Sequence, residues 1–281
     1  MRLALSLAVV ASLSSSASAE PSNPAFLGIG MHDQMGQAPG ASAVVGPCII
    51  DETTAGSGAK QAGLLPGDIL QNIDGISVSN CDAVLQVVQS HEPGDPIRIG
   101  VIRYGRQSLM IEARLISRAE ILRRRFGDQP IAPIELVGVQ GEKRYDLRDL
   151  RGRTAIVGWY DASRCDGCSQ VFRRIASWVR GQSTKSGSSM IALAATAADL
   201  DSPDQLKKLR SVELDVPLTA VEPITFETLT IRDIKRIHFM VIDRFGIVRY
   251  IAPVFPNGDD TEAVLDELFA AAEQASRRSS R

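Results

Sequence analysis

Apolar and polar positions follow two different patterns along this chain. Between residues 24 and 117, short apolar runs alternate with turn residues, which predicts a succession of short strands. The predicted strands are 26–31, 46–51, 68–73, 97–104 and 107–115. One amphipathic helix is expected at 81–90, with Asp82 near its start. Its apolar face consists of Ala83, Val84, Val87 and Val88.

The second half, residues 131–276, alternates strands with helices. A buried strand is predicted at 154–160, and the largely apolar run 189–195 is typical of a strand covered on both faces. Helices are expected at 171–179, 204–211 and 262–275, and a hairpin joins strands 238–243 and 246–251. This pattern favours a central sheet covered by helices. The chain is therefore predicted to be multidomain, α+β followed by α/β.

A bridging segment, residues 118–130, separates the two halves. A short helix is predicted at 118–126, and the turn residues of 127–130 mark a domain boundary. The basic clusters at 123–125 and in the tail 277–281 are interpreted as solvated helix surface and a frayed end.

The first 19 residues have the features of a secretory signal peptide. Arg2 provides a positive start, residues 3–13 are mostly apolar, and Ala17-Ser18-Ala19 forms a small-residue cleavage site. The apolar run is too short to span a bilayer comfortably, and no cysteine near the cut suggests a lipid anchor. A buried N-terminal helix is the alternative. We expect an exported, periplasmic protein without a membrane anchor.

Composition narrows the function classes. Hydrophobic residues make up 44% and charged residues 23% of the chain, and the formal net charge is −2. These values are typical of a globular protein and indicate no nucleic-acid partner. No Gly-x-Ser-x-Gly nucleophile motif occurs in the sequence.

The tetrad Cys165-Asp166-Gly167-Cys168 lies between a predicted strand and a predicted helix. With Cys165 at the start of that helix, unpaired N–H groups and the helix dipole would stabilise its thiolate. The tetrad can be a redox dithiol, a structural disulfide or half of a zinc site. Zinc would need a second ligand pair, whereas the other cysteines and the histidines are scattered, so no metal and no cofactor is expected.

Cys48 and Cys81 lie far upstream of the tetrad. In an exported protein they can form a second disulfide, or they can be small buried residues.

The run Ala62-Gly63-Leu64-Leu65-Pro66-Gly67-Asp68-Ile69-Leu70 resembles the core signature of PDZ domains. Phe26-Leu27-Gly28-Ile29 resembles the carboxylate-binding loop of the HtrA-type variant. The resemblance covers residues 24–117 and implies a partly open β-barrel with helices.

The PDZ resemblance also implies a peptide-binding role. An extended peptide would add as a strand beside the Gly28 strand, with its C-terminal carboxylate held by backbone N–H groups. The implied amides are those of Leu27, Gly28 and Ile29, and the implied opposite wall consists of Ala83, Val84 and Val87. The segment 33–43 lengthens the following loop, which either covers this groove or is a mobile insertion.

The second half resembles the thioredoxin superfamily, closest to TlpA-like and peroxiredoxin-like members. The motifs that carry this resemblance are residues 127–133, residues 145–153, the cysteine tetrad and the strand pair around 239–246. It implies a central mixed sheet flanked by helices. It also implies that Cys165 is the nucleophile, that Cys168 resolves the mixed disulfide, and that a thiol–disulfide donor or acceptor protein is a partner.

Two positions depart from the thioredoxin pattern. The stretch 235–239 has no proline where the family has a cis-proline, which leaves Ile237 or His238 beside the dithiol. His238 would either tune the thiolate or be an ordinary strand residue. Arg164 replaces the usual aromatic residue before the first cysteine and should favour the thiolate, whereas Asp166 should oppose it. Asp161 is a candidate buried acid or a capping residue near Ser163.

These observations predict an exported thiol–disulfide oxidoreductase with a PDZ module that binds the C-termini of substrates or partners. The alternative is a non-catalytic PDZ scaffold whose thioredoxin-like domain is redox-inactive. A peroxidase is disfavoured, because Ser163 is too close to Cys165 to act as the required hydroxyl residue.

Overall fold

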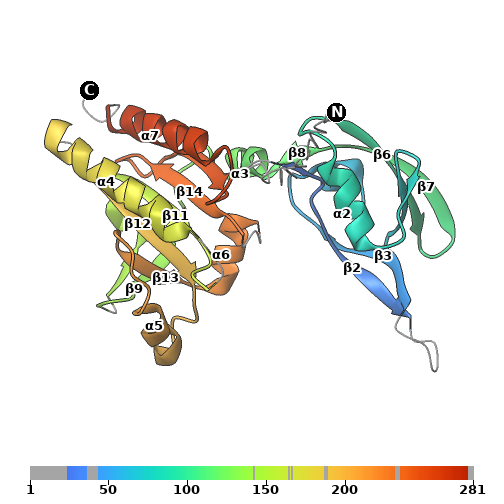
Figure 1. Ribbon diagram of the computed structural model, residues 1–281, viewed down its shortest axis with the longest axis horizontal. Coiled ribbons are helices and arrows are strands. Elements are labelled where there is room, and N and C mark those ends of the chain that lie inside the picture. The colour runs from blue at the N-terminus through green and yellow to red at the C-terminus, as the bar shows by residue number, and fades with distance from the viewer. Residues whose placement is uncertain are drawn as a thin grey trace, which may run out of the picture.

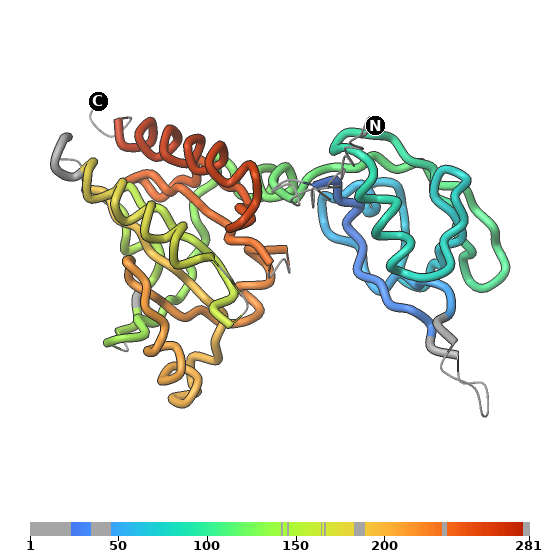
Figure 2. The backbone as a smooth tube through the Cα atoms, viewed as in Figure 1, coloured from blue at the N-terminus to red at the C-terminus, as the bar shows by residue number. Residues whose placement is uncertain are grey.

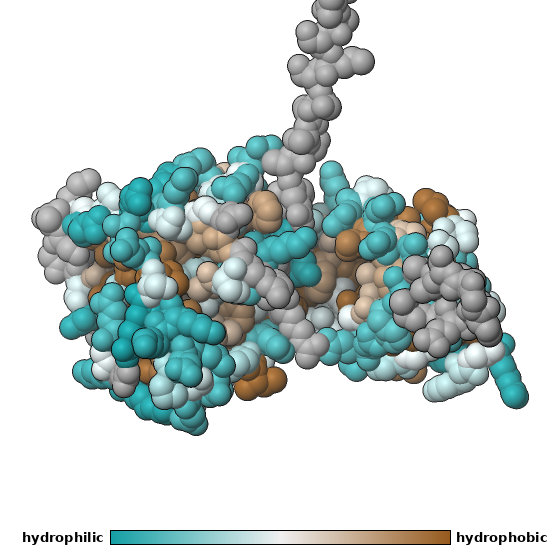
Figure 3. Space-filling view, turned by 60° about the horizontal axis from the view of Figure 1, so that its bottom comes forward, coloured by the Kyte–Doolittle hydropathy of each residue, from teal (hydrophilic) through white to brown (hydrophobic). Residues whose placement is uncertain are grey.

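The computed structural model describes residues 24–36, 44–141, 143–163, 165, 167–186, 189–231 and 235–277. The predicted signal peptide, Arg164, Asp166 and tail residues 278–281 lie outside the described residues. Two domains are joined by helix α3 (Arg118–Phe126), seen in green between them in Figures 1 and 2. Hydrophilic side chains dominate the face shown in Figure 3, with apolar patches between them. No helix in the described ranges has the length and apolar character needed to cross a membrane.

The N-terminal domain is built on a sheet that does not close into a barrel. Its described strands run in the order β2-β3-β4-β6-β7, with β5 paired to β4. All pairings within this sheet are antiparallel. The elements are β2 (Ile29–Gly36), β3 (Val44–Thr53), α1 (Gly58–Ala62), β4 (Ile69–Ile73), β5 (Ile76–Ser77), α2 (Cys81–Gln89), β6 (Pro96–Arg103) and β7 (Gln107–Arg114). Strand β2 is therefore an edge strand.

A buried ion pair holds the turn that leads into β4. Asp68 is almost fully buried, and the guanidinium of Arg103 donates two hydrogen bonds to its carboxylate at 2.8 and 2.7 Å. The backbone N–H of Leu65 donates a third at 2.9 Å. Burial alone would raise the pKa of Asp68, but these bonds hold that pKa below its usual value. The acidic residue of the sequence signature thus has a structural role.

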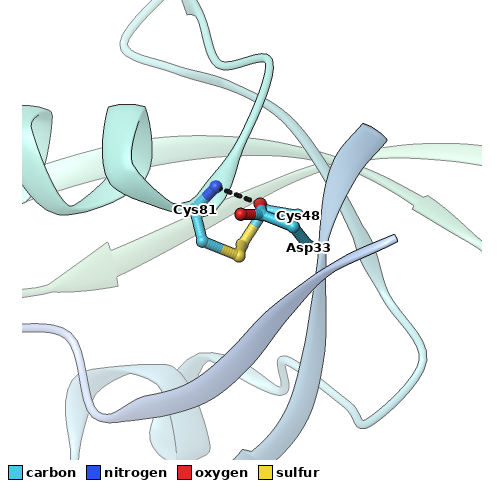
Figure 4. Close-up of side chains that lie close together, drawn as sticks. All are labelled: Asp33, Cys48 and Cys81. Carbon is cyan, nitrogen blue, oxygen red and sulfur yellow. Dashed lines mark hydrogen bonds between the residues drawn. A yellow bond between two sulfur atoms is a disulfide. The ribbon is translucent and has the colours of Figure 1, made fainter. Parts of the chain in front are cut away.

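A disulfide joins helix α2 to the sheet. Cys48 of β3 is bonded to Cys81 at the start of α2 (Figure 4). Of the two alternatives for these cysteines, a disulfide or two small buried residues, the structure has the disulfide. The carboxylate of Asp33, from β2, accepts the Cys81 backbone N–H at 2.6 Å. The carboxylate of Asp33 and the sulfurs of Cys48 and Cys81 are close enough together to hold a metal ion. The two sulfurs are bonded to each other, however, and a disulfide has no thiolate with which to ligate a metal.

Helix α3 is packed into the C-terminal domain. It follows a small two-stranded sheet in which β1 (Ala25–Phe26) pairs with β8 (Ile116–Ser117). The hydroxyl of Ser117 caps the helix by accepting the Glu120 N–H at 3.1 Å. Ile121 and Leu122 are fully buried in a core cluster with residues of the C-terminal sheet. The segment predicted as a linker therefore includes a helix that shares a core with the second domain.

The C-terminal domain has a mixed sheet of seven strands among the described residues. Their order is β10-β9-β13-β12-β11-β14-β15, in which β11, β12 and β13 are parallel and the remaining pairings are antiparallel. The elements are β9 (Glu135–Gly138), β10 (Arg144–Asp146), η1 (Leu147–Leu150), β11 (Thr154–Trp159), α4 (Cys168–Ser186), β12 (Met190–Ala197), α5 (Pro203–Leu209), β13 (Leu218–Val221), α6 (Pro223–Thr230), β14 (Ile237–Ile242), β15 (Val248–Val254) and α7 (Thr261–Arg277).

Helices cover both faces of this sheet. Apolar residues of α4 and α7 form one core cluster with Ile156, whereas α3 and α6 form another with Ala155 and Val157. Neighbouring residues of β11 therefore enter different cores, as expected for a strand whose side chains alternate. The predicted central mixed sheet flanked by helices is confirmed.

Most predicted elements are confirmed within a few residues, and helix 118–126 coincides with α3. Helices α1 and α6 were not predicted. Both are short, and α6 contains Thr225, Thr228 and Thr230, which have low helix propensity. Packing of Phe226 and Leu229 against the sheet stabilises this helix.

The Cys48–Cys81 bond closes a loop of 33 residues, so it should restrict the unfolded N-terminal domain. We expect Cys48→Ala/Cys81→Ala to lower the free energy of unfolding of that domain by about 3 kcal/mol, measured by urea titration. The control is Cys165→Ala/Cys168→Ala. It removes a disulfide between residues only 3 positions apart in the sequence, so the free energy of unfolding should fall by less. An unchanged midpoint in the first variant would contradict this role.

Candidate functional site

The cysteine tetrad connects β11 to α4. Cys165 and Cys168 form a disulfide, with their Cα atoms 5.7 Å apart. Cys168 is only 2% exposed, whereas Cys165 is partly exposed. The two sulfurs of the pair thus belong to residues with unequal access to solvent.

Helix α4 begins at Cys168, so the expectation that Cys165 stands at its start was wrong. Gly167 has φ +86°, a left-handed conformation that cannot continue a right-handed helix back to Cys165. Its carbonyl accepts the N–H groups of Gln170 and Val171 at 3.1 and 3.3 Å and so closes the first turn. Cys165 precedes the helix by three residues.

The loop between β15 and α7 lies against the tetrad. A Cβ atom added to Gly167 would lie 2.6 Å from Oδ1 of Asn257 and 3.3 Å from Cβ of Pro256. Position 167 of the tetrad therefore needs glycine for two reasons: the left-handed backbone angle, and the lack of space for a side chain beside Asn257 and Pro256. Our sequence reasoning missed this loop, although a Pro-Asn-Gly turn directly after a strand was a usable signal.

Asp161 acts as a turn residue. Its carboxylate accepts the backbone N–H of Ser163 at 2.9 Å and the Ser163 hydroxyl at 2.6 Å. This geometry corresponds to the capping alternative rather than to a buried acid. The neighbouring Tyr160 is buried, and burial followed by the negative charge of Asp161 raises the pKa of its hydroxyl, which therefore stays protonated at neutral pH.

The two candidates at the proline position point to different faces of the sheet. Ile237, the first residue of β14, is buried in the same cluster as Cys168. His238 is also buried, but it stands opposite Trp159 of β11, whose side chain belongs to the cluster on the other face. Directly opposed residues share a face, so His238 lies on the face away from Cys168. The described residues contain no cis peptide bond.

A second candidate site is a groove between edge strand β2 and helix α2, with a cavity of about 130 Å³. Of the predicted residues, Leu27, Gly28, Ile29 and Val84 line it, whereas Ala83 and Val87 do not. Ala83 and Val87 are partly buried against the domain's core, to which Val84 and Val88 also belong. The lining residues that were not predicted are Met31, Leu85, Val88, Gln89 and Arg118, together with residues 24–26.

Two carbonyls of the loop before β2 are hydrogen-bonded within the domain. The carbonyl of Leu27 accepts the N–H of Ala59 at 3.0 Å, and the carbonyl of Gly28 accepts that of Thr54 at 2.8 Å. In a trans peptide the N–H of the next residue points opposite to the carbonyl. The amides of Gly28 and Ile29 therefore face away from these partners.

Residues 25–112 match the family model described as PDZ domain. This part of the chain is a PDZ domain. The groove between β2 and α2 lies in this domain, and we call it the PDZ groove. Its role as a site for a peptide carboxylate stays a prediction.

Solved structures are similar to each domain separately. The first domain is similar to the HtrA-type protease AlgW with a decapeptide, at 25% identity and TM-score 0.29, over 34% of this chain and 30% of that chain. It is also similar to the HtrA3 PDZ domain bound to a phage-derived ligand, at 19% identity and TM-score 0.28, over 34% of this chain and 88% of that chain. This chain thus matches less than a third of the AlgW chain.

The second domain is similar to a Chlorobium tepidum protein assigned as thiol:disulfide interchange protein DsbE. The identity is 20% and the TM-score 0.39, over 52% of this chain and 97% of that chain. No curated protein matched the sequence. The domain has the central mixed sheet flanked by helices that the thioredoxin resemblance implied, with Cys168 at the N-terminal end of α4.

Gly28 should be essential to the carboxylate loop. It has φ +84°, and an added Cβ would lie 2.1 Å from Cβ of Ser57. Gly56 is a matched control, with φ +81° and nothing within 4 Å of an added Cβ. We expect Gly56→Ala to lower the free energy of unfolding by about 1 kcal/mol through backbone strain alone. Gly28→Ala should lower it clearly more, because the added Cβ also meets Ser57. Thermal unfolding of both variants measures this, and equal losses would show that the contact with Ser57 is unimportant.

Proposed function

We propose that this protein is an exported thiol–disulfide oxidoreductase whose PDZ domain binds the C-termini of substrate or partner proteins. The observation that carries the redox part is the unequal exposure of Cys165 and Cys168. An incoming disulfide has to reach the attacking sulfur, whereas the resolving sulfur only has to reach its neighbour. The partly exposed Cys165 suits the first role and the buried Cys168 the second.

The reaction proceeds by two exchanges. In the reduced protein, the Cys165 thiolate attacks one sulfur of a substrate disulfide, and the other substrate sulfur leaves as a thiolate. Cys168, after losing its proton, then attacks the Cys165 sulfur and releases the remaining substrate thiolate. Two electrons pass to the substrate, and the protein is left with the Cys165–Cys168 disulfide. A partner dithiol restores the reduced form, and the reverse sequence oxidises a substrate.

The local charges support a reactive thiolate at Cys165. Helix α4 begins at Cys168, the last residue of the tetrad, and its first N–H groups favour negative charge near the helix start. The carboxylate of Asp161 is engaged by Ser163, and Tyr160 remains neutral, so neither is poised to take the cysteine proton. We therefore assign no general base and expect access and the helix terminus to control reactivity.

The PDZ domain supplies recruitment. Among the described strands, β2 is paired on one side only, to β3, and groove-lining residues of β2 lie opposite α2. A peptide can add to this edge through main-chain hydrogen bonds. In Figure 1 the N-terminal end of α4 lies toward the middle of the molecule, and its other end points away from the PDZ domain. Because α3 is packed rather than flexible, the bound chain itself has to span the distance to Cys165.

We expect Cys165→Ser to abolish the reduction of insulin disulfides in the presence of dithiothreitol, because the attacking thiolate is lost. Cys168→Ser should instead accumulate a mixed disulfide, detectable by mass spectrometry. The double variant Cys48→Ala/Cys81→Ala retains the tetrad and is the control that should keep activity. Full turnover by Cys165→Ser would overturn the redox proposal.

A second candidate function is a non-catalytic PDZ scaffold in which the Cys165–Cys168 bond is structural. Two observations favour it: both candidates for the missing proline, Ile237 and His238, are buried, and the loop with Pro256 and Asn257 lies against the tetrad. Both restrict the approach of a protein substrate.

The reduction potential of the Cys165–Cys168 pair separates the two functions. For an oxidoreductase we expect a value between about −120 and −270 mV in a glutathione or dithiothreitol titration with thiol trapping. Cys48→Ala/Cys81→Ala keeps the second pair from contributing to the signal. A value below about −300 mV, or reduction only on unfolding, would favour the scaffold.

A further inference from the structure

The PDZ groove contains one charged residue that lies outside the PDZ match. The family match ends at residue 112, whereas Arg118, the first residue of α3, lines the groove together with the carboxylate loop. The other groove-lining residues in the described part of the chain are apolar apart from Gln89 and Gly28. The charge of the lining is therefore positive.

The fold brings Arg118 to this loop through a local strand pairing. Ser117 of β8 stands opposite Ala25 of β1, so the next residue along the chain emerges beside the start of the loop. The guanidinium carbon of Arg118 lies 4.0 Å from the centroid of the Phe26 ring, within cation–π distance. Phe26 directly precedes Leu27 and Gly28, which line the groove, and the Gly28 and Ile29 amides face away from the partners of the loop's carbonyls.

We propose that Arg118, which lies outside the PDZ match, is a counter-charge for the terminal carboxylate of a peptide bound in this groove. This inference rests on the proposed peptide-binding function and adds a specificity residue to it. A guanidinium has five N–H donors in a planar fork, so it can lie over Phe26, keep other partners and still receive a carboxylate.

The residues that line the PDZ groove indicate which ligand it would hold. Leu27, Val84 and Val88 are apolar and buried, so the cavity suits an apolar side chain, while the Gly28 and Ile29 amides and Arg118 suit an anion. A peptide C-terminus presents these two chemistries side by side. Arg118 also borders a larger cavity next to α6, but acidic and basic residues mix there, with Glu52, Glu227 and Arg125 in its wall. That cavity has no comparable preference for an anion.

The test uses the full-length mature chain and two pools of fluorescent decapeptides that differ only at the end. Both pools have randomised positions before a final valine, one with a free carboxylate and one with a terminal amide. We expect the wild-type protein to bind the acid pool at least tenfold more tightly than the amide pool in fluorescence anisotropy. Arg118→Met keeps an apolar stem over Phe26 but removes the charge. It should lose about tenfold in affinity for the acid pool and leave the amide pool unchanged.

Controls separate charge from folding. Arg118→Lys should retain part of the acid preference, and Arg123→Ala should retain all of it, because Arg123 is an exposed residue of the same helix paired with Glu120. The acid-to-amide ratio is independent of the fraction of folded protein, so it remains valid if a variant is less stable. An unchanged ratio in Arg118→Met would overturn the role of Arg118 and leave peptide binding intact. Failure of the wild type to bind either pool would overturn the peptide-binding function, and this inference with it.

Discussion

The burial of one side of helix α3 is the constraint on which the arrangement of this molecule depends. Ile121 and Leu122 are fully buried with residues of the C-terminal sheet, and Ile116 belongs to the same cluster. Phe26, from the start of the PDZ domain, packs against that cluster. Full burial of such aliphatic side chains stabilises a fold by about 1.5–3 kcal/mol each. A helix held in this way cannot act as a flexible tether.

The same helix therefore belongs to both domains. Its first residue reaches the carboxylate loop of the PDZ groove, and its body covers the face of the sheet opposite α4. The residue that borders the groove thus belongs to a helix whose body is anchored in the C-terminal domain.

Each of the two candidate sites contains a glycine that its surroundings require. Gly28 and Gly167 both have left-handed backbone angles, and each stands where another part of the chain approaches within contact distance. In the PDZ domain the neighbouring residue is Ser57, next to the loop that borders the groove. In the second domain the neighbours are Asn257 and Pro256, which lie against Gly167 of the cysteine tetrad. Both candidate sites thus depend on backbone geometry as well as on their side chains.

The sequence by itself determined the two domains, their element order and the signatures of both, because hydrophobic periodicity and turn residues are local properties. It also singled out Leu27, Gly28 and Ile29 and the two cysteines of the tetrad as candidates. Only the tertiary structure decided that Leu85 and Val88, rather than Ala83 and Val87, line the groove with Val84, and that His238 lies on the face away from Cys168. It also brought Arg118 and Asn257 to the sites. These outcomes depend on contacts between segments far apart in the chain, and no local pattern encodes which face of an element meets which neighbour.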